Sequence, residues 1–145
     1  MIVYFDTSAL AKLHLVESES GLVKQLATEA RLIGTSVLAR VEMAAAIAKA
    51  VRMQQLTRTN AARVVQGFRK TWPDYAAVQV SEAVIFEADR LAWEQGLRGY
   101  DAVHLASARI WEQAIGEPVT VATFDRLMWG AVLEVHMQVW PAMLK

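Results

Sequence analysis

Residues Ile2–Leu10 read IVYFDTSAL, an apolar run followed by one acid, two hydroxyl residues and the start of a helical pattern. The run Ile2–Phe5 consists of strong β-formers and is too short for a helix, so we expect a strand there. One of the two hydroxyl residues can cap a helix that continues through Ala9–Leu15. A strand that leads directly into a helix, with Asp6 at the junction, is the repeating unit of α/β proteins.

The same alternation continues along the chain. Further strands are expected at Leu32–Ser36, Ala77–Val80, Val119–Ala122 and Val135–Trp140. Helical patterns fill the segments between them, with expected helices at about Ser20–Ala30, Ser36–Val51, Thr57–Trp72, Ser81–Gln95, Asp101–Gln113 and Asp125–Trp129. This order predicts one α/β domain spanning residues 1–145, with a central, mostly parallel sheet of about five strands and helices on both faces.

Acids recur at similar places in this pattern, each after apolar residues at the end of a strand or near the start of a helix: Asp6, Glu42, Asp101 and Asp125. Binding sites in parallel sheets lie at the carboxyl ends of the strands, so these acids can meet in one crevice. Buried carboxylates are costly to ionise alone, and an all-oxygen set favours a shared Mg²⁺ or Mn²⁺ ion. Such a site suits phosphodiester cleavage. Taken singly, each acid is better explained as a helix cap or surface residue; the matching local context of all four favours the shared site.

Other polar residues stand close to these acids in the sequence. The hydroxyls of Thr7, Ser8 and Thr123 can bind a carboxylate, a water or a phosphate. Lys12 and Arg98 flank the first and third acids, where they can neutralise the site before a metal arrives or contact phosphate, although surface ion pairs are an equal alternative. His104 follows Asp101 by three residues, and we expect it to be a packed, hydrogen-bonded core histidine rather than a metal ligand.

The charge is unevenly distributed. The chain has 15 basic and 15 acidic residues, which argues against nucleic-acid binding through bulk charge. However, the segment Met43–Pro73 contains no acid and carries several bases, among them Arg52, Arg58, Arg63 and Arg69. These arginines are candidates for contacts with a phosphate backbone; a solvated helix face is the other explanation.

Composition limits the class of protein. Hydrophobic residues make up 54% of the chain, which leaves apolar surface for a partner, and we expect a homodimer or a bound protein. Cysteine is absent, which excludes disulfides and thiolate nucleophiles. The N-terminus does not resemble a signal peptide, and no uncharged apolar stretch reaches the roughly 18 residues of a membrane helix. We therefore expect a soluble, cytoplasmic protein without membrane contact.

Four segments also carry a family resemblance: YFDTSALAKL at 4–13, ARVE at 39–42, LRGYDAVHLA at 97–106 and TFDRL at 123–127. They resemble the successive signatures of PIN-domain ribonucleases, above all the VapC toxins of prokaryotic toxin–antitoxin pairs. The resemblance implies a PIN-like three-layer sandwich and a Mg²⁺- or Mn²⁺-dependent endoribonuclease that cleaves RNA with Asp6, Glu42, Asp101 and Asp125. It also implies a homodimer and a cognate VapB-like antitoxin that inserts a peptide near the active site.

Two other functions are compatible with the residues. A metal-dependent phosphatase of the haloacid dehalogenase type also places an aspartate after its first strand, but it requires a second aspartate two residues later, where this chain has Ser8. A non-catalytic module could use the same acids to receive a basic partner peptide. Metal dependence distinguishes this module from both enzymes.

Overall fold

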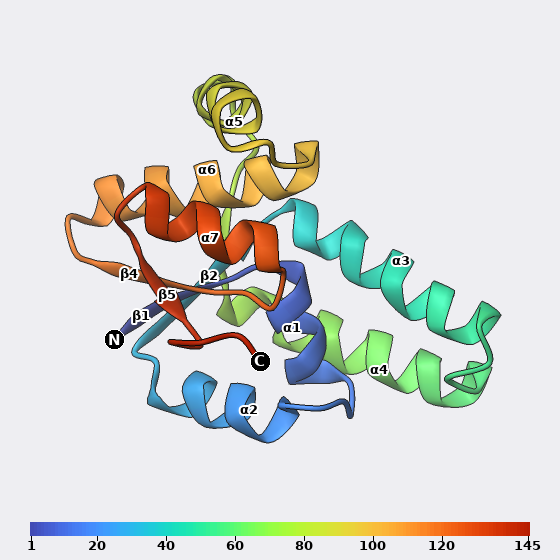
Figure 1. Ribbon diagram of the computed structural model, residues 1–145. Helices are drawn as coiled ribbons and strands as arrows, with labels where there is room; N and C mark the ends of the chain where they lie inside the picture. Colours follow the sequence, from blue (N-terminus) through green and yellow to red (C-terminus); the bar gives the residue numbers. More distant parts are fainter.

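The central strand of the sheet is β1 (Ile2–Phe5), as Figure 1 shows for the computed structural model, which describes residues Met1–Lys145. The other strands are β2 (Leu32–Ser36), β3 (Ala76–Val78), β4 (Val119–Ala122) and β5 (Gln138–Trp140). The strand order is β3-β2-β1-β4-β5, and every neighbouring pair is parallel. All carboxyl ends therefore lie at one edge of the sheet. The expectation of a mostly parallel sheet of about five strands is confirmed.

Helices cover both faces of the sheet (Figure 1). They are α1 (Thr7–His14), α2 (Ser20–Glu29), α3 (Leu38–Arg52), α4 (Arg58–Thr71), α5 (Glu82–Gln95), α6 (Gly99–Ile115) and α7 (Arg126–Glu134), with a short 3₁₀ helix, η1, at Trp72–Asp74. None of them is long and apolar enough to cross a lipid bilayer.

Alternate residues of β1 divide the core into two layers, because successive side chains of a strand point to opposite faces. Ile2 and Tyr4 pack with buried residues of α5, α6 and α7. Val3 and Phe5 pack with buried residues of α1, α2, α3 and α4. All four side chains are almost completely buried, which explains why this run is apolar at every position rather than at every second one.

The close approach of α6 to the sheet depends on a glycine. Gly34 lies in β2, and a Cβ atom built on it would meet the ring of Trp111 from α6 at 2.5 Å. Trp111 also lies beside Tyr4, with ring centroids 6.4 Å apart. Gly34 thus allows a large aromatic ring to lie directly on the strand.

Most boundaries agree with the sequence analysis. Three strands, Ile2–Phe5, Leu32–Ser36 and Val119–Ala122, have the expected bounds. The last helix and strand differ, because α7 continues five residues beyond Trp129 to Glu134, and β5 is shortened to Gln138–Trp140. Ala131 and Val132 are buried on the inner side of this extended helix, and their packing accounts for the longer helix.

The first helix cap also differs from expectation. Asp6 itself, rather than Thr7 or Ser8, caps α1 by accepting a hydrogen bond from the backbone N–H of Ala9 at 3.0 Å. Asp125 caps α7 in the same way through the N–H of Met128 at 2.9 Å. Each of these two carboxylates therefore stabilises the start of a helix, in addition to lying at the carboxyl edge of the sheet.

Candidate active site

Asp6 lies at the end of β1 and is only 3% exposed. One carboxylate oxygen accepts hydrogen bonds from the Ser8 hydroxyl at 2.6 Å and the Ala9 N–H, and the other accepts from the Thr123 hydroxyl at 2.5 Å. Burial raises the pKa of Asp6, while the hydrogen bonds from Ser8, Thr123 and Ala9 act in the opposite direction. No lysine or arginine pairs with this buried carboxylate.

Strand pairing explains why Thr123 reaches Asp6. Phe5 and Ala122 are register partners at the ends of β1 and β4, so the residues that follow them leave the sheet side by side. The Thr123 hydroxyl donates to Asp6 and accepts from the backbone N–H of Asp125 at 3.1 Å. It therefore links two of the acids through one buried side chain.

Glu42 enters the site from the second turn of α3. Its Oε1 atom accepts a hydrogen bond from the Thr7 hydroxyl at 2.8 Å and lies 2.6 Å from Nε2 of His104. His104 is 1% exposed, and its Nδ1 atom lies 2.8 Å from the hydroxyl of Tyr4. Burial raises the pKa of Tyr4 well above its usual value, so the hydroxyl keeps its proton.

The hydrogen bonds of His104 fit a neutral ring. The protonated Tyr4 hydroxyl can donate to Nδ1, and Nε2–H can then donate to Glu42. The expectation of a packed, hydrogen-bonded histidine is confirmed. Its connection to Glu42 was not visible in the sequence, where the two residues are separated by 62 positions; the only local signal is the spacing of three residues between Asp101 and His104.

Asp101 and Asp125 are joined by an arginine. Asp101 lies in the first turn of α6, Asp125 lies before α7, and Arg98 donates to both: Nε to Asp101 at 2.9 Å and Nη2 to Asp125 at 2.8 Å. Burial raises the pKa of Asp101, the hydrogen bond from Arg98 lowers it, and the negative charges of Asp125 and Asp6 raise it. The structure thus places these acids within electrostatic reach of one another.

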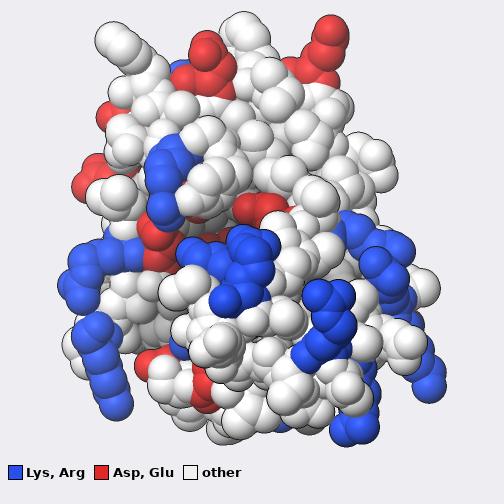
Figure 2. All heavy atoms as spheres, turned by 90° about the vertical axis from the view of Figure 1, so that its right-hand side faces the viewer, with Lys and Arg blue, Asp and Glu red and all other residues white.

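The acids form a recessed surface at the edge where the strands end. Figure 2 faces this side of the molecule and shows acidic atoms in a central hollow with basic atoms on both sides. Asp6 is a buried carboxylate with no lysine or arginine partner, and its oxygens are of the kind that hard divalent metal ions bind. No group of three or more His, Asp and Glu side chains is already arranged to hold such an ion. The donor types fit a metal, and two of the four acids, Asp101 and Asp125, already carry a cation in Arg98.

The candidate phosphate-binding residues lie in different surroundings. Lys12 pairs with Glu19 at 2.9 Å and with Glu17 at 3.7 Å, and it contacts none of the acids of the site. In contrast, all four arginines of the acid-free segment are exposed and lack ion-pair partners closer than 4.0 Å: Arg52, Arg58, Arg63 and Arg69. Their charges are therefore available to a ligand.

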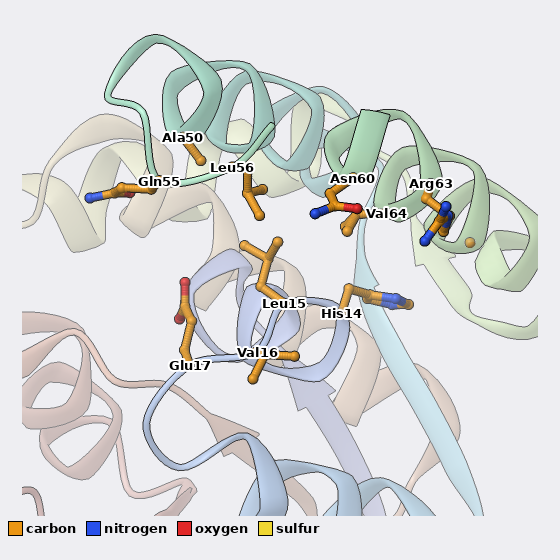
Figure 3. Close-up of a pocket in the computed structure, with 11 residues that line it drawn as sticks. His14, Leu15, Val16, Glu17, Ala50, Gln55, Leu56, Asn60, Arg63 and Val64 are labelled. Carbon is orange, nitrogen blue, oxygen red and sulfur yellow. The ribbon is translucent and has the colours of Figure 1, made fainter. Parts of the chain in front are cut away.

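The largest pocket lies beside this segment rather than at the acids. It has a volume of about 740 Å³ and opens between the end of α1 and the α3–α4 pair. Figure 3 shows Leu15 on one side, pointing toward Leu56 on the other, with Val64 beside Asn60 and Arg63 at one end. The pocket is suited to an apolar segment that carries some polar side chains.

Comparison with known proteins identifies the family. The model of the PIN domain matches residues 3–128. Ribonuclease VapC45 from Mycobacterium tuberculosis is 36% identical over 144 residues, which cover 99% of this chain and 97% of that protein.

Solved structures share the fold at lower identity. Mycobacterium tuberculosis VapC20, described as a toxin that cleaves the sarcin–ricin loop, has a TM-score of 0.64 and 17% identity, covering 89% of this chain and 94% of that chain. A toxin–antitoxin complex from Klebsiella pneumoniae has a TM-score of 0.60 and 19% identity, covering 85% and 86%. Because the family model and the VapC45 alignment both span most of the sequence, this chain belongs to the PIN-domain family and groups with its VapC ribonucleases.

Proposed function

We propose that this protein is an endoribonuclease that cleaves RNA phosphodiester bonds with Mg²⁺ or Mn²⁺ and acts as the toxin of a type II toxin–antitoxin pair. One observation carries the proposal: at the carboxyl edge of the sheet, Thr123 links Asp6 to Asp125, and Arg98 links Asp125 to Asp101. Thr7, which follows Asp6 in the chain, donates a hydrogen bond to the fourth acid, Glu42. The sequence similarity to ribonuclease VapC45 over nearly the whole chain also supports RNA cleavage.

Asp6, Glu42, Asp101 and Asp125 are the residues proposed to hold the ion. A bound divalent cation supplies two effects in such a site: it lowers the pKa of water, and it stabilises negative charge on phosphate oxygens. The protein contributes positioning. Ser8 and Thr123 hold Asp6 from opposite oxygens, so the carboxylate cannot rotate freely. Thr7 and His104 both contact Oε1 of Glu42 and orient this carboxylate from one side.

The competing phosphatase lacks support. Ser8, at the position where that family needs a second aspartate, has its hydroxyl committed to Asp6 and to the backbone N–H of Phe124 at 2.9 Å. It is therefore part of the support for Asp6 and offers no second acid.

RNA binding is proposed along the exposed arginines of α3 and α4. Phosphate contacts provide most of the affinity in nucleic-acid complexes and make it depend on salt. Changing Arg58 and Arg69 together to alanine should reduce the slope of log Kd against log salt by about 1 to 2. Arg31→Ala, which removes a cation already paired with Glu117, is the matched control and should leave the slope nearly unchanged.

Two protein partners are proposed. A VapB-like antitoxin segment fits the pocket between α1 and the α3–α4 pair, and the toxin–antitoxin complex with the same fold supports such a partner. A second copy of this chain would cover exposed apolar residues of α5, where Phe86 is 79% and Trp93 is 90% exposed. Light scattering at micromolar concentration tests the dimer directly, and a monomer would refute it.

Cleavage of a defined single-stranded RNA tests the enzyme. Purified protein should cut with Mg²⁺ or Mn²⁺ and stop in EDTA. Asp6→Asn and Asp101→Asn should each lower the cleavage rate by about 100-fold or more, because an anionic ligand is replaced by a neutral, weaker one. Asp89→Asn makes the same chemical change at an exposed position on α5 and should retain activity. Full activity of Asp6→Asn, or of the native protein in EDTA, would refute the proposed mechanism.

A further inference from the structure

Arg98 occupies an unusual place for a surface arginine. It is the residue before α6, and its guanidinium reaches two carboxylates that belong to different helices, Asp101 and Asp125. The guanidinium also lies 4.9 Å from the centre of the Tyr100 ring. Both contacted atoms are Oδ2 oxygens, so one cation joins the two acids.

Burial differs sharply between the partners. The side chain of Asp101 is 8% exposed and that of Asp125 is 25% exposed, whereas that of Arg98 is 54% exposed. The carboxylates are held by the fold, and Asp125 is further fixed by its bond to the Met128 N–H. The arginine covers them from the solvent side on a flexible stem, so it can leave without disturbing the core. Because the arginine of each pair is itself half exposed to solvent, water screens these ion pairs and the arginine can be exchanged.

The remaining acids of the site have no comparable partner. Asp6 is bound only by hydroxyls and a backbone N–H, and Glu42 by Thr7 and His104. Arg98 is therefore the one arginine or lysine that pairs with any of these four acids. It offsets the repulsion between the Asp101 and Asp125 carboxylates when no other cation is present.

We propose that Arg98 is a built-in counter-ion that competes with the divalent metal for Asp101 and Asp125 and moves into solvent when the metal binds. The inference rests on the proposed metal-dependent function and concerns regulation of the same site. A carboxylate oxygen that accepts a hydrogen bond from the guanidinium cannot also coordinate a metal along the same direction. In addition, the guanidinium and the metal ion each neutralise the negative charge of the same two carboxylates. Arg98 thereby lowers the metal affinity below the value that the acids alone would provide.

Calorimetric titration of the metal-free protein with Mn²⁺ tests the competition. Arg98→Gln should bind Mn²⁺ about two- to fivefold more tightly than the native protein, the range expected for removal of one partly exposed ion pair. Its metal-free form should melt at a lower temperature and recover when Mn²⁺ is added. Arg98→Lys, which keeps the charge but cannot bridge two carboxylates, should have an intermediate affinity.

Arg126→Gln is the control for a general change in charge. Arg126 is adjacent to Asp125 in sequence, but its side chain contacts the carbonyl of Lys145 rather than an acid of the site. Its removal should change Mn²⁺ affinity less than twofold, because exposed charges that make no direct contact are screened by solvent and salt. Equal tightening in Arg98→Gln and Arg126→Gln, or unchanged affinity in Arg98→Gln, would overturn the competition.

Movement of the arginine is observable without any activity assay. In a ¹⁵N-labelled sample, the Nε–H signal of Arg98 is the one lost in Arg98→Lys. Saturating Mg²⁺ should shift this signal to the position of a solvent-exposed guanidinium. A signal that stays in place while Mg²⁺ binds would overturn the Arg98 inference and leave the proposed function intact. If neither metal binds to the native protein or the variants, the metal-dependent function fails together with the inference.

Discussion

Replacement of Gly34 by alanine should destabilise the protein and impair its active site at the same time. The added Cβ atom would lie 2.5 Å from Cη2 and Cζ3 and 2.8 Å from Cε3 of Trp111. Carbon atoms in good contact are separated by roughly 3.5–4.0 Å, so the ring must retreat by about 1 Å. Trp111 belongs to α6, the helix that also carries Asp101 and His104. The displacement should therefore reach the site.

The cost follows from overpacking. Extra methyl groups forced into a packed core cost roughly 1–3 kcal/mol, and the ring cannot escape easily because it is 9% exposed and lies beside Tyr4. The lower chain entropy of alanine returns about 0.5–1 kcal/mol. The net loss should be about 1–2 kcal/mol, or roughly 2–8 °C in melting temperature for a chain of this length. Because misplacement of catalytic groups by about 1 Å can reduce rates by roughly 100-fold, RNA cleavage should fall even where the protein is folded.

Urea unfolding followed by circular dichroism measures the stability change. Gly67→Ala is the matched control: Gly67 lies within α4, its Cβ would meet nothing within 4 Å, and alanine should stabilise the helix by about 0.5–1 kcal/mol. A double variant with Trp111→Leu should lose less stability than the two single variants combined, since the smaller side chain relieves the clash. Unchanged stability of Gly34→Ala would refute the close packing of α6 on β2.

Further substitutions address the polar network. Tyr4→Phe removes the buried donor to Nδ1 of His104 and should cost about 1–3 kcal/mol by urea unfolding; a neutral effect would show that the hydroxyl does not support the histidine. Thr123→Val removes the hydrogen bond to Asp6 and should lower cleavage activity about 10- to 100-fold with the fold retained, as measured by initial rates and circular dichroism. Burial lowers the pKa of His14 in the folded protein below that in the unfolded chain. The free energy of unfolding associated with neutral His14 is therefore fully present above the unfolded-state pKa, and it is lost as the pH falls through the folded-state pKa. His14→Gln should therefore lose less free energy of unfolding than the native protein between about pH 7.5 and 5, values on either side of the usual histidine pKa, and equal losses would exclude His14 as a source of this dependence.

The local sequence determined the elements and the location of the candidate acids along them. Ile2–Phe5 is a run of β-forming residues too short for a helix, and Ser81 begins α5 because its hydroxyl accepts from the Val84 N–H at 3.2 Å. These signals act over a few residues and need no knowledge of the rest of the fold. The family segments added the expectation of an RNA-cleaving site, and the PIN-domain match confirms the family.

Only the tertiary structure decided which groups meet. The pairing of Phe5 with Ala122 brings Thr123 to Asp6 across 117 positions of sequence. Helices α3 and α6 cover opposite faces of the sheet, and His104 of α6 meets Glu42 of α3 across 62 positions. The two-carboxylate contact of Arg98 likewise depends on how α7 lies beside α6. Hydrophobic periodicity records which face of an element is buried but not which partner covers it. The choice of partner depends on packing of the whole chain, because the free energy of burial is shared among residues distant in sequence.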